Sequence, residues 1–245
     1  MKPRIAIPEP TSSDAEYNQR ALPQYVSAVE AEGAKAVVIP ANATPQEIAK
    51  LVTGCDGVLL PGSPADVDPQ KFGAERHPKT APADPARDNV DELLLQDAHN
   101  LHKPVLGICY GLQSLNVWRT GTLLQHIENT PVNHSAGRQI QFAHDIEIAP
   151  GSKLSAIFGQ TRIRVNSSHH QSAEDPGDGL RVVATCPTDG IIEAVEGTTP
   201  EHFVVAVQWH PERTYDVDES SKMIFREFVK AARLWKPREV SESVG

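Results

Sequence analysis

The sequence predicts an α/β fold with a central, mostly parallel β-sheet that is flanked by helices and extended by antiparallel strands. In the first half of the chain, short apolar runs alternate with helical patterns. Each run is bounded by Pro or Gly, as is typical of buried parallel strands. The second half changes to a series of short strand patterns. The 245 residues divide most simply into one domain over 1–236 and a frayed tail over 237–245.

The first half of the chain contains four expected strands and two expected helices. The apolar runs predict strands at 4–8, 36–40, 57–60 and 104–108. Helical patterns cover 14–32 and 88–102, and Asp88 stands where an N-cap would. This order predicts βαβ units with right-handed crossovers. The long irregular stretch 61–87 is predicted to be a functional or mobile loop.

The second half is expected to be rich in strands. Ile140, Phe142, Ile146 and Ile148 alternate with polar residues, which predicts one strand. Further strands are expected at 162–165, 180–185, 191–195 and 203–209. A closing helix is predicted to begin at Asp218, because the apolar residues that follow share one helical face.

Composition limits the partners and the compartment. The chain has 23 Lys and Arg against 32 Asp and Glu, a net charge of −9, and no long basic run. Binding to nucleic acid or to an anionic membrane is therefore not expected. No apolar stretch approaches the roughly 18 residues that span a bilayer, and no signal peptide is recognisable. Three cysteines, an odd number, favour free thiols. We expect a cytoplasmic protein with a small-molecule ligand.

One strand runs directly into a glycine-flanked cysteine. Gly107, Cys109 and Gly111 form a G-x-C-x-G pattern between the strand at 104–108 and a helical pattern. This is the arrangement of a nucleophile elbow with Cys in place of Ser. Two glycines allow a sharp turn that exposes the sulfur, and the helix N-terminus beneath it favours a thiolate. The alternative is that Cys109 is a small apolar residue buried at a tight turn.

A second strand ends in a histidine and a nearby carboxylate. His210 follows the apolar run 203–209, and Glu212 stands two residues later. A cysteine nucleophile needs an imidazole for proton transfer, and the imidazole needs a carboxylate to orient it. Because active sites of α/β proteins lie at the carboxyl ends of strands, His210 is expected beside Cys109. A single histidine after a strand is more often structural. The inference of a catalytic cysteine and histidine therefore rests on finding the glycine-flanked cysteine and the His-Pro-Glu segment in one chain.

The motifs together resemble the class I glutamine amidotransferase superfamily. The resemblance is strongest to the peptidase C26 group of γ-glutamyl hydrolases, most closely the γ-glutamyl-γ-aminobutyrate hydrolases. The segments that carry it are 61–73 (PGSPADVDPQKFG), 84–88 (DPARD), 107–111 (GICYG), 165–171 (VNSSHHQ) and 206–212 (AVQWHPE). It implies a flavodoxin-like fold and hydrolysis of a γ-glutamyl amide through a thioester. It also implies a place in polyamine (putrescine) degradation. No cofactor or metal is expected, and a homodimer is a possible assembly.

The resemblance also implies roles for individual residues. Cys109 would be the nucleophile, His210 the general acid and base, and Glu212 the orienting carboxylate. The backbone N–H of Tyr110, with that of Gly62 or Ser63, would form the oxyanion hole.

The glutamyl group would be held by Gln113, Ser167, Ser168 and His169. Without the resemblance, Gln113 would be interpreted as an exposed helix residue and His169 as part of a polar loop. Many members of the family have Arg where this chain has Tyr110, which puts the leaving-group specificity in doubt.

Three other functions remain open from the sequence. The chain could be a glutaminase subunit that passes ammonia to a synthetase partner. It could act on folate poly-γ-glutamate chains. It could also be a catalytically silent binding domain on the same scaffold, although the intact Cys109, His210 and Glu212 argue against this.

Overall fold

The computed structural model describes residues 1–237, so the predicted frayed tail lies almost entirely outside the described residues. Within them, nine strands form one sheet: β1 (Arg4–Pro8), β2 (Lys35–Ile39), β3 (Gly57–Leu60), β4 (Val105–Ile108), β6 (His144–Ile148), β7 (Arg162–Val165), β9 (Leu180–Thr185), β10 (Ile192–Gly197) and β11 (Val204–Val207). The short strands β5 (Leu123–Leu124) and β8 (Ser172–Ala173) pair separately.

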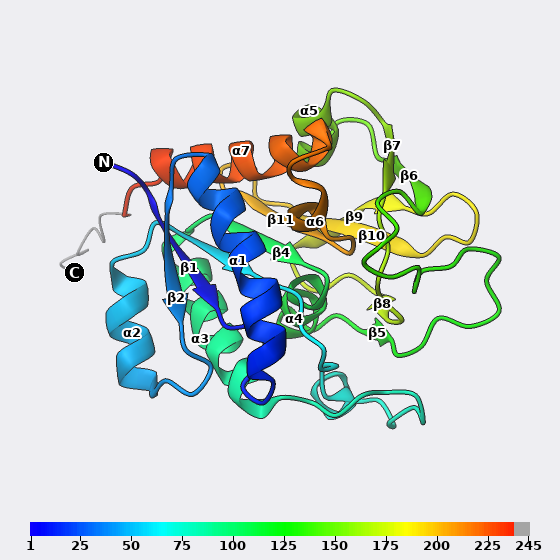
Figure 1. The fold of residues 1–245 in the computed structure, drawn as a ribbon, viewed down its shortest axis with the longest axis horizontal. Helices are drawn as coiled ribbons and strands as arrows, with labels where there is room; N and C mark the ends of the chain where they lie inside the picture. The colour runs from blue at the N-terminus through cyan, green and yellow to red at the C-terminus, as the bar shows by residue number, and fades with distance from the viewer. Residues whose placement is uncertain (238–245) are drawn as a thin grey trace, which may run out of the picture.

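The sheet order is β2-β1-β3-β4-β11-β10-β9-β6-β7 (Figure 1). The first five strands in this order are parallel to one another. The other four pair antiparallel with their neighbours. The parallel part has the order of a flavodoxin-like sheet. The predicted fold class, a mostly parallel central sheet with antiparallel additions, is therefore confirmed.

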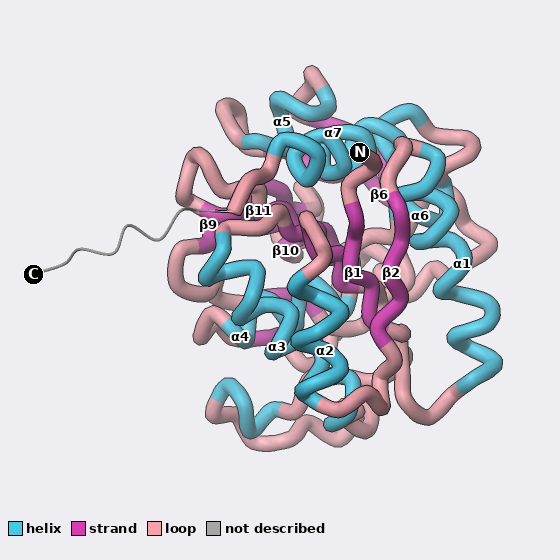
Figure 2. The backbone as a smooth tube through the Cα atoms, turned by 90° about the vertical axis from the view of Figure 1, so that its left-hand side faces the viewer, coloured by secondary structure: helices cyan, strands magenta, loops and turns pink. Residues whose placement is uncertain are grey.

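Helices cover both faces of the sheet: α1 (Ala15–Ala31), α2 (Pro45–Thr53), α3 (Pro85–Leu101), α4 (Tyr110–Trp118), α5 (Lys153–Phe158), α6 (Pro211–Thr214) and α7 (Glu219–Leu234). Helices α1, α5 and α7 lie apart from α2, α3 and α4 (Figure 2). The first group packs into one apolar cluster and the second group into another. A 3-10 helix, η1 (Pro69–Phe72), lies in the predicted loop 61–87. Among the described helices, none combines the length and apolar character that a membrane crossing requires.

Two predicted boundaries are wrong for identifiable physical reasons. Helix α3 begins earlier than predicted, because Asp84 caps it by accepting from the Arg87 N–H. Asp88 instead accepts a hydrogen bond from the Tyr110 hydroxyl. The strand predicted from the alternating apolar residues begins only at His144, the first residue that pairs with β7. Ile140 and Phe142 come before this pairing begins, and both are exposed.

The carboxyl ends of three adjacent parallel strands bring the candidate residues together. Strand β4 lies between β3 and β11. Gly62 follows β3, Cys109 follows β4 and His210 follows β11, each within three residues of the strand's end. Neighbouring parallel strands end at the same edge of a sheet, so these three positions are neighbours in space.

The turn from β4 into α4 leaves no room for a side chain at Gly111. A Cβ there would lie 2.2 Å from the Leu60 carbonyl oxygen and 2.7 Å from the Leu60 Cβ. These atoms belong to the central strand β3 and its backbone, so they cannot move aside cheaply.

We expect Gly111→Ala to lower the free energy of unfolding by about 1–3 kcal/mol or more, because overpacking forces the backbone apart. Urea denaturation of the purified variant measures this. Gly54→Ala is the matched control, since its Cβ would meet no atom closer than 3.7 Å among the described residues. An equal effect of the two substitutions would contradict the packing argument.

Candidate active site

Cys109 occupies a strained position between strand and helix. Its backbone has φ 54° and ψ −108°, a left-handed conformation that a residue with a Cβ rarely adopts. Strain of this kind is typical of nucleophile elbows. The side chain is 7% exposed and lines a pocket of about 260 Å³. The backbone N–H of Tyr110 acts to lower the pKa of the thiol.

His210 and Glu212 form a buried pair on the neighbouring segment. His210 Nδ1 lies 2.8 Å from Glu212 Oε1, so this nitrogen donates to the carboxylate and Nε2 is left for another partner. Asn166 holds the histidine backbone from both sides: its amide accepts from the His210 N–H at 2.9 Å and donates to the His210 carbonyl at 2.8 Å. The imidazole therefore has a fixed position and tautomer.

Cys109 and His210 lie close together at the same pocket. Both residues line it. A Cβ placed on Gly62 would be 3.0 Å from His210 Cε1 and 3.6 Å from Cys109 Cβ, so the two side chains meet across this glycine. A larger residue at position 62 would press on the His210 ring and on the Tyr25 hydroxyl, which would lie 3.2 Å from its Cβ.

Burial favours the uncharged forms of the cysteine and the histidine. Desolvation raises the pKa of Cys109 to about 12, although the charge of Arg213 opposes this. Desolvation also lowers the pKa of His210, and the Glu212 carboxylate only partly compensates. Burial therefore opposes the thiolate that the helix N-terminus is expected to favour. Both pKa shifts favour a thiol beside a neutral imidazole, and a neutral imidazole can act as a base.

The two candidate oxyanion donors after β3 differ. The Gly62 N–H already donates to the buried hydroxyl of Tyr25, at 3.1 Å. Ser63 lines the pocket beside it. Of the two predicted alternatives, the Gly62 N–H is therefore already paired, and Ser63 is the residue that lines the pocket.

The residues predicted to hold the glutamyl group separate into two groups. Gln113, Ser168 and His169 line the pocket. Ser167 does not, because it is fully buried and its hydroxyl donates to the His134 carbonyl. The His169 nitrogens also point elsewhere: Nδ1 lies 2.9 Å from the Gln171 carbonyl, and Nε2 faces Glu193. Neither ring nitrogen of His169 therefore faces a ligand in the pocket.

Three arginines in the pocket were not expected from the sequence. Arg20, Arg138 and Arg213 all line it, and Asp66 is the carboxylate among its described lining residues. Arg213 directly follows the His-Pro-Glu motif, and this position could have indicated that it lies at the pocket. Arg20 lies on an exposed turn of α1 and Arg138 in an irregular loop, and neither has a local pattern that marks it. The pocket is cationic although the whole chain carries a charge of −9.

Residues with the composition of a metal site lie beside the pocket rather than around Cys109. They are His134, His144, His169 and Glu193, and their inward ligand atoms are all within 4.8 Å of one another. His169 belongs to both the cluster and the pocket wall.

Comparison with known proteins identifies the family. The Peptidase C26 family model matches residues 5–212. The chain is 36% identical to a glutamine amidotransferase-like protein of Lactococcus lactis over 200 residues, covering 80% of this chain and 82% of that protein. It is 32% identical to the γ-glutamyl-γ-aminobutyrate hydrolase of Escherichia coli over 220 residues, covering 86% and 85%.

A solved structure gives independent support for the fold. A protein of Thermoplasma acidophilum that is described as part of a GMP synthase has a TM-score of 0.62 to this chain, with 15% identity and 95% coverage of both chains. At this identity the likeness concerns the fold alone. The family match extends from the first strand to the His-Pro-Glu motif, and this chain belongs to the Peptidase C26 family.

Proposed function

We propose that this protein hydrolyses a γ-glutamyl amide, with Cys109 as nucleophile, His210 as general acid and base, and Glu212 as the carboxylate that orients His210. One observation carries the proposal. Cys109 lines the same pocket as His210, which is paired with Glu212, and three arginines line that pocket too. Hydrolase-named and amidotransferase-named relatives support a reaction at an amide.

The first half of the reaction begins from the uncharged pair. His210 Nε2 takes the thiol proton as the Cys109 sulfur attacks the side-chain carbonyl of the substrate. The C–O π electrons move onto the oxygen, which the N–H groups of Tyr110 and Ser63 would stabilise. When the tetrahedral intermediate collapses, the C–N bond breaks and imidazolium His210 donates its proton to the departing amine. A γ-glutamyl thioester remains on Cys109.

The second half uses the same groups in reverse. Water takes the place of the amine, and neutral His210 removes its proton as the oxygen attacks the thioester. Cleavage of the C–S bond returns the proton to the sulfur and releases glutamate. Glu212 stabilises the imidazolium that forms in each half.

The charge of the pocket favours substrates with carboxylates at both ends. A γ-glutamyl group has one α-carboxylate, and an amine such as γ-aminobutyrate adds a second. Arg20, Arg138 and Arg213 provide more cationic groups than one carboxylate requires. We therefore propose γ-glutamyl-γ-aminobutyrate, or a γ-glutamyl amide of similar charge, as substrate in preference to free glutamine.

Replacing the nucleophile tests the reaction. Cys109→Ala should fold normally and lose at least about 10³-fold in glutamate release from γ-glutamyl-γ-aminobutyrate, because no covalent intermediate can form. The assay should compare this substrate with glutamine, other γ-glutamyl amines and folate polyglutamate. Activity of the variant within about tenfold of wild type would exclude the mechanism, and a wild-type preference for glutamine would favour the glutaminase alternative.

The resting state of the cysteine can be tested with iodoacetamide. For a thiol with a pKa of about 12, the thiolate fraction rises tenfold per pH unit, so the alkylation rate should increase by about 100-fold between pH 7 and pH 9. The experiment uses a Cys55→Ala/Cys186→Ala background, which leaves Cys109, and follows its modification by mass spectrometry. A rate that is constant between pH 6 and pH 8 would indicate a resting thiolate–imidazolium pair instead.

Arg138 tests how the substrate is recognised. Its guanidinium donates to the Gln24 side-chain oxygen at 2.9 Å, and the residue lines the pocket. Arg138→Gln should raise KM for the doubly anionic substrate by about tenfold or more, since a hydrogen bond to a charged group is worth about 1.5–3 kcal/mol. We expect kcat to change by less than about threefold. Arg162→Gln, which removes a surface arginine paired with Asp145, is the control and should leave KM unchanged.

A further inference from the structure

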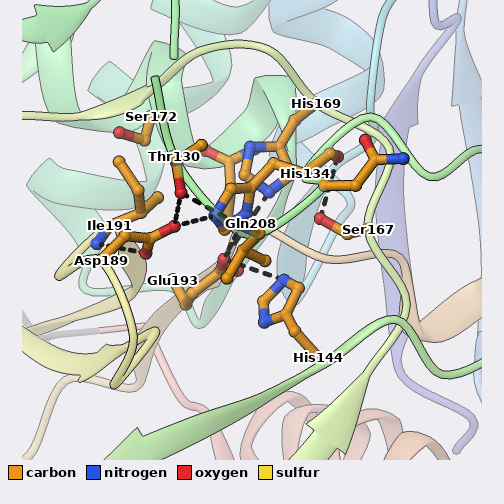
Figure 3. Close-up of polar contacts among 12 residues, drawn as sticks. Thr130, His134, His144, Ser167, His169, Ser172, Asp189, Ile191, Glu193 and Gln208 are labelled. Atoms are coloured by element: carbon orange, nitrogen blue, oxygen red, sulfur yellow. Dashed lines mark hydrogen bonds and ion pairs between the residues drawn. The ribbon is translucent and has the colours of Figure 1, made fainter. Parts of the chain in front are cut away.

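Three histidines and a glutamate converge in the interior beside the pocket (Figure 3). His134 comes from the loop before β6, His144 from β6, His169 from the segment after β7 and Glu193 from β10. Each is at least nine-tenths buried, and Glu193 is fully buried. Glu193 Oε1 lies 3.3 Å from His134 Nδ1, 3.3 Å from His144 Nε2 and 3.7 Å from His169 Nε2.

The outer nitrogen of each imidazole has an acceptor. His134 Nε2 lies 3.0 Å from Asp189 Oδ2. His169 Nδ1 lies 2.9 Å from the Gln171 carbonyl, and His144 Nδ1 lies 3.2 Å from the Asp145 carbonyl. Carbonyl and carboxylate oxygens only accept hydrogen bonds, so the outer nitrogens carry the hydrogens. In a neutral imidazole the other nitrogen then has a lone pair, and all three lone pairs point inward.

The centre of the cluster therefore consists of acceptors that face one another. Within residues 1–237, none of the inward nitrogens and neither oxygen of Glu193 has a hydrogen-bond partner. Buried polar groups without partners are costly, and here five such atoms share one place. Protonating every ring would place three cations against two carboxylates, Glu193 and Asp189, in the interior, and a single proton would satisfy only one pair. A divalent cation satisfies all four side chains at once.

We propose that His134, His144, His169 and Glu193 bind a divalent transition-metal ion, with Zn²⁺ as the best match. Imidazole nitrogen and carboxylate oxygen are zinc ligands, and structural zinc sites have four ligands. Metal–ligand bonds of about 2.0–2.1 Å place tetrahedral ligand atoms about 3.3 Å apart, close to the separations of Glu193 Oε1 from His134 and His144. This site departs from the sequence-based expectation that the protein holds no metal.

The surroundings match those of a metal site. Ligating histidines usually donate their second N–H to a carboxylate or a backbone carbonyl, which fixes the ring and raises its basicity. All three histidines have such a partner. Asp189 also accepts from the Thr130 hydroxyl and the Ile191 N–H, and these bonds hold its carboxylate in place against His134. The charges of Glu193 and Asp189 together balance a divalent cation.

The ion would stabilise the pocket wall rather than take part in the reaction. It would join four chain segments, of which the His169 segment lines the pocket. Two of these segments are already connected at His134, whose carbonyl accepts from the His169 N–H and the Ser167 hydroxyl. Cys109 and His210 are not among the ligands.

Metal content tests the site without reference to hydrolytic activity. Protein without a polyhistidine tag is stripped with a chelator, reloaded with ZnCl₂, separated from excess metal and analysed by mass spectrometry of the metal. We expect one Zn²⁺ per chain, a thermal midpoint that rises with ZnCl₂ concentration, and the intense visible absorption of four-coordinate Co²⁺ after loading with CoCl₂. Less than about 0.2 equivalents of Zn²⁺ and no midpoint shift would overturn the proposal.

Variants locate the ion. Glu193→Gln and His144→Asn should each weaken Zn²⁺ binding by at least about 100-fold, and Asp189→Asn by about 10- to 100-fold. The matched control is His99→Ala, which removes an exposed histidine and should keep full metal content. Zinc retained equally by Glu193→Gln and wild type would place the metal elsewhere and refute the assignment. If a variant does not fold, the wild-type stoichiometry and Co²⁺ spectrum still decide the question.

Discussion

The turn at Cys109 is the constraint on which the rest of the site depends. A left-handed backbone at a residue with a Cβ costs roughly 1–3 kcal/mol, and the surrounding structure must supply that energy. Strand β4 is paired on both sides, by β3 and β11, and the Cys109 N–H itself donates to the Val207 carbonyl at 2.8 Å. Helix α4 can begin at once only because Gly111 lies directly against the Leu60 carbonyl. The sulfur therefore points toward the pocket as a consequence of how three central strands pack.

Buried polar side chains hold the neighbouring loops in place around that sulfur. Arg87 is completely buried, forms an ion pair with Asp91, and donates to the carbonyls of Pro10 and Pro61. The Pro61 contact fixes the start of the loop that carries Gly62 and Ser63. Asn166 does the same for His210. Such groups are expensive to leave unpaired, so each loop has one strongly preferred position, and the apolar core alone would not provide this.

The sequence was sufficient for the parallel half of the fold and for the residues that follow its strands. Strands β1 and β3 have the predicted bounds, because buried parallel strands are short apolar runs between Pro and Gly. Cys109 and His210 could be expected at one pocket because both follow such strands. Side chains on loops could not be placed in this way. Nothing in the local sequence of Arg138 or His134 shows what it faces, because that depends on how loops pack across the sheet edge.

The two histidines His169 and His210 line the same pocket but differ in which ring nitrogens are free. His169 resembles a substrate contact by its motif, yet one of its nitrogens is bonded to the Gln171 carbonyl and the other faces Glu193. Neither nitrogen is therefore available to a ligand in the pocket. His210, in contrast, uses one nitrogen for Glu212, and the proposed mechanism uses the other for proton transfer. Selection of the proposed γ-glutamyl substrate then depends mainly on groups that still have unused donors, and the arginines of the pocket fit this description best. The charge of the released amine is therefore expected to matter more for specificity than its shape.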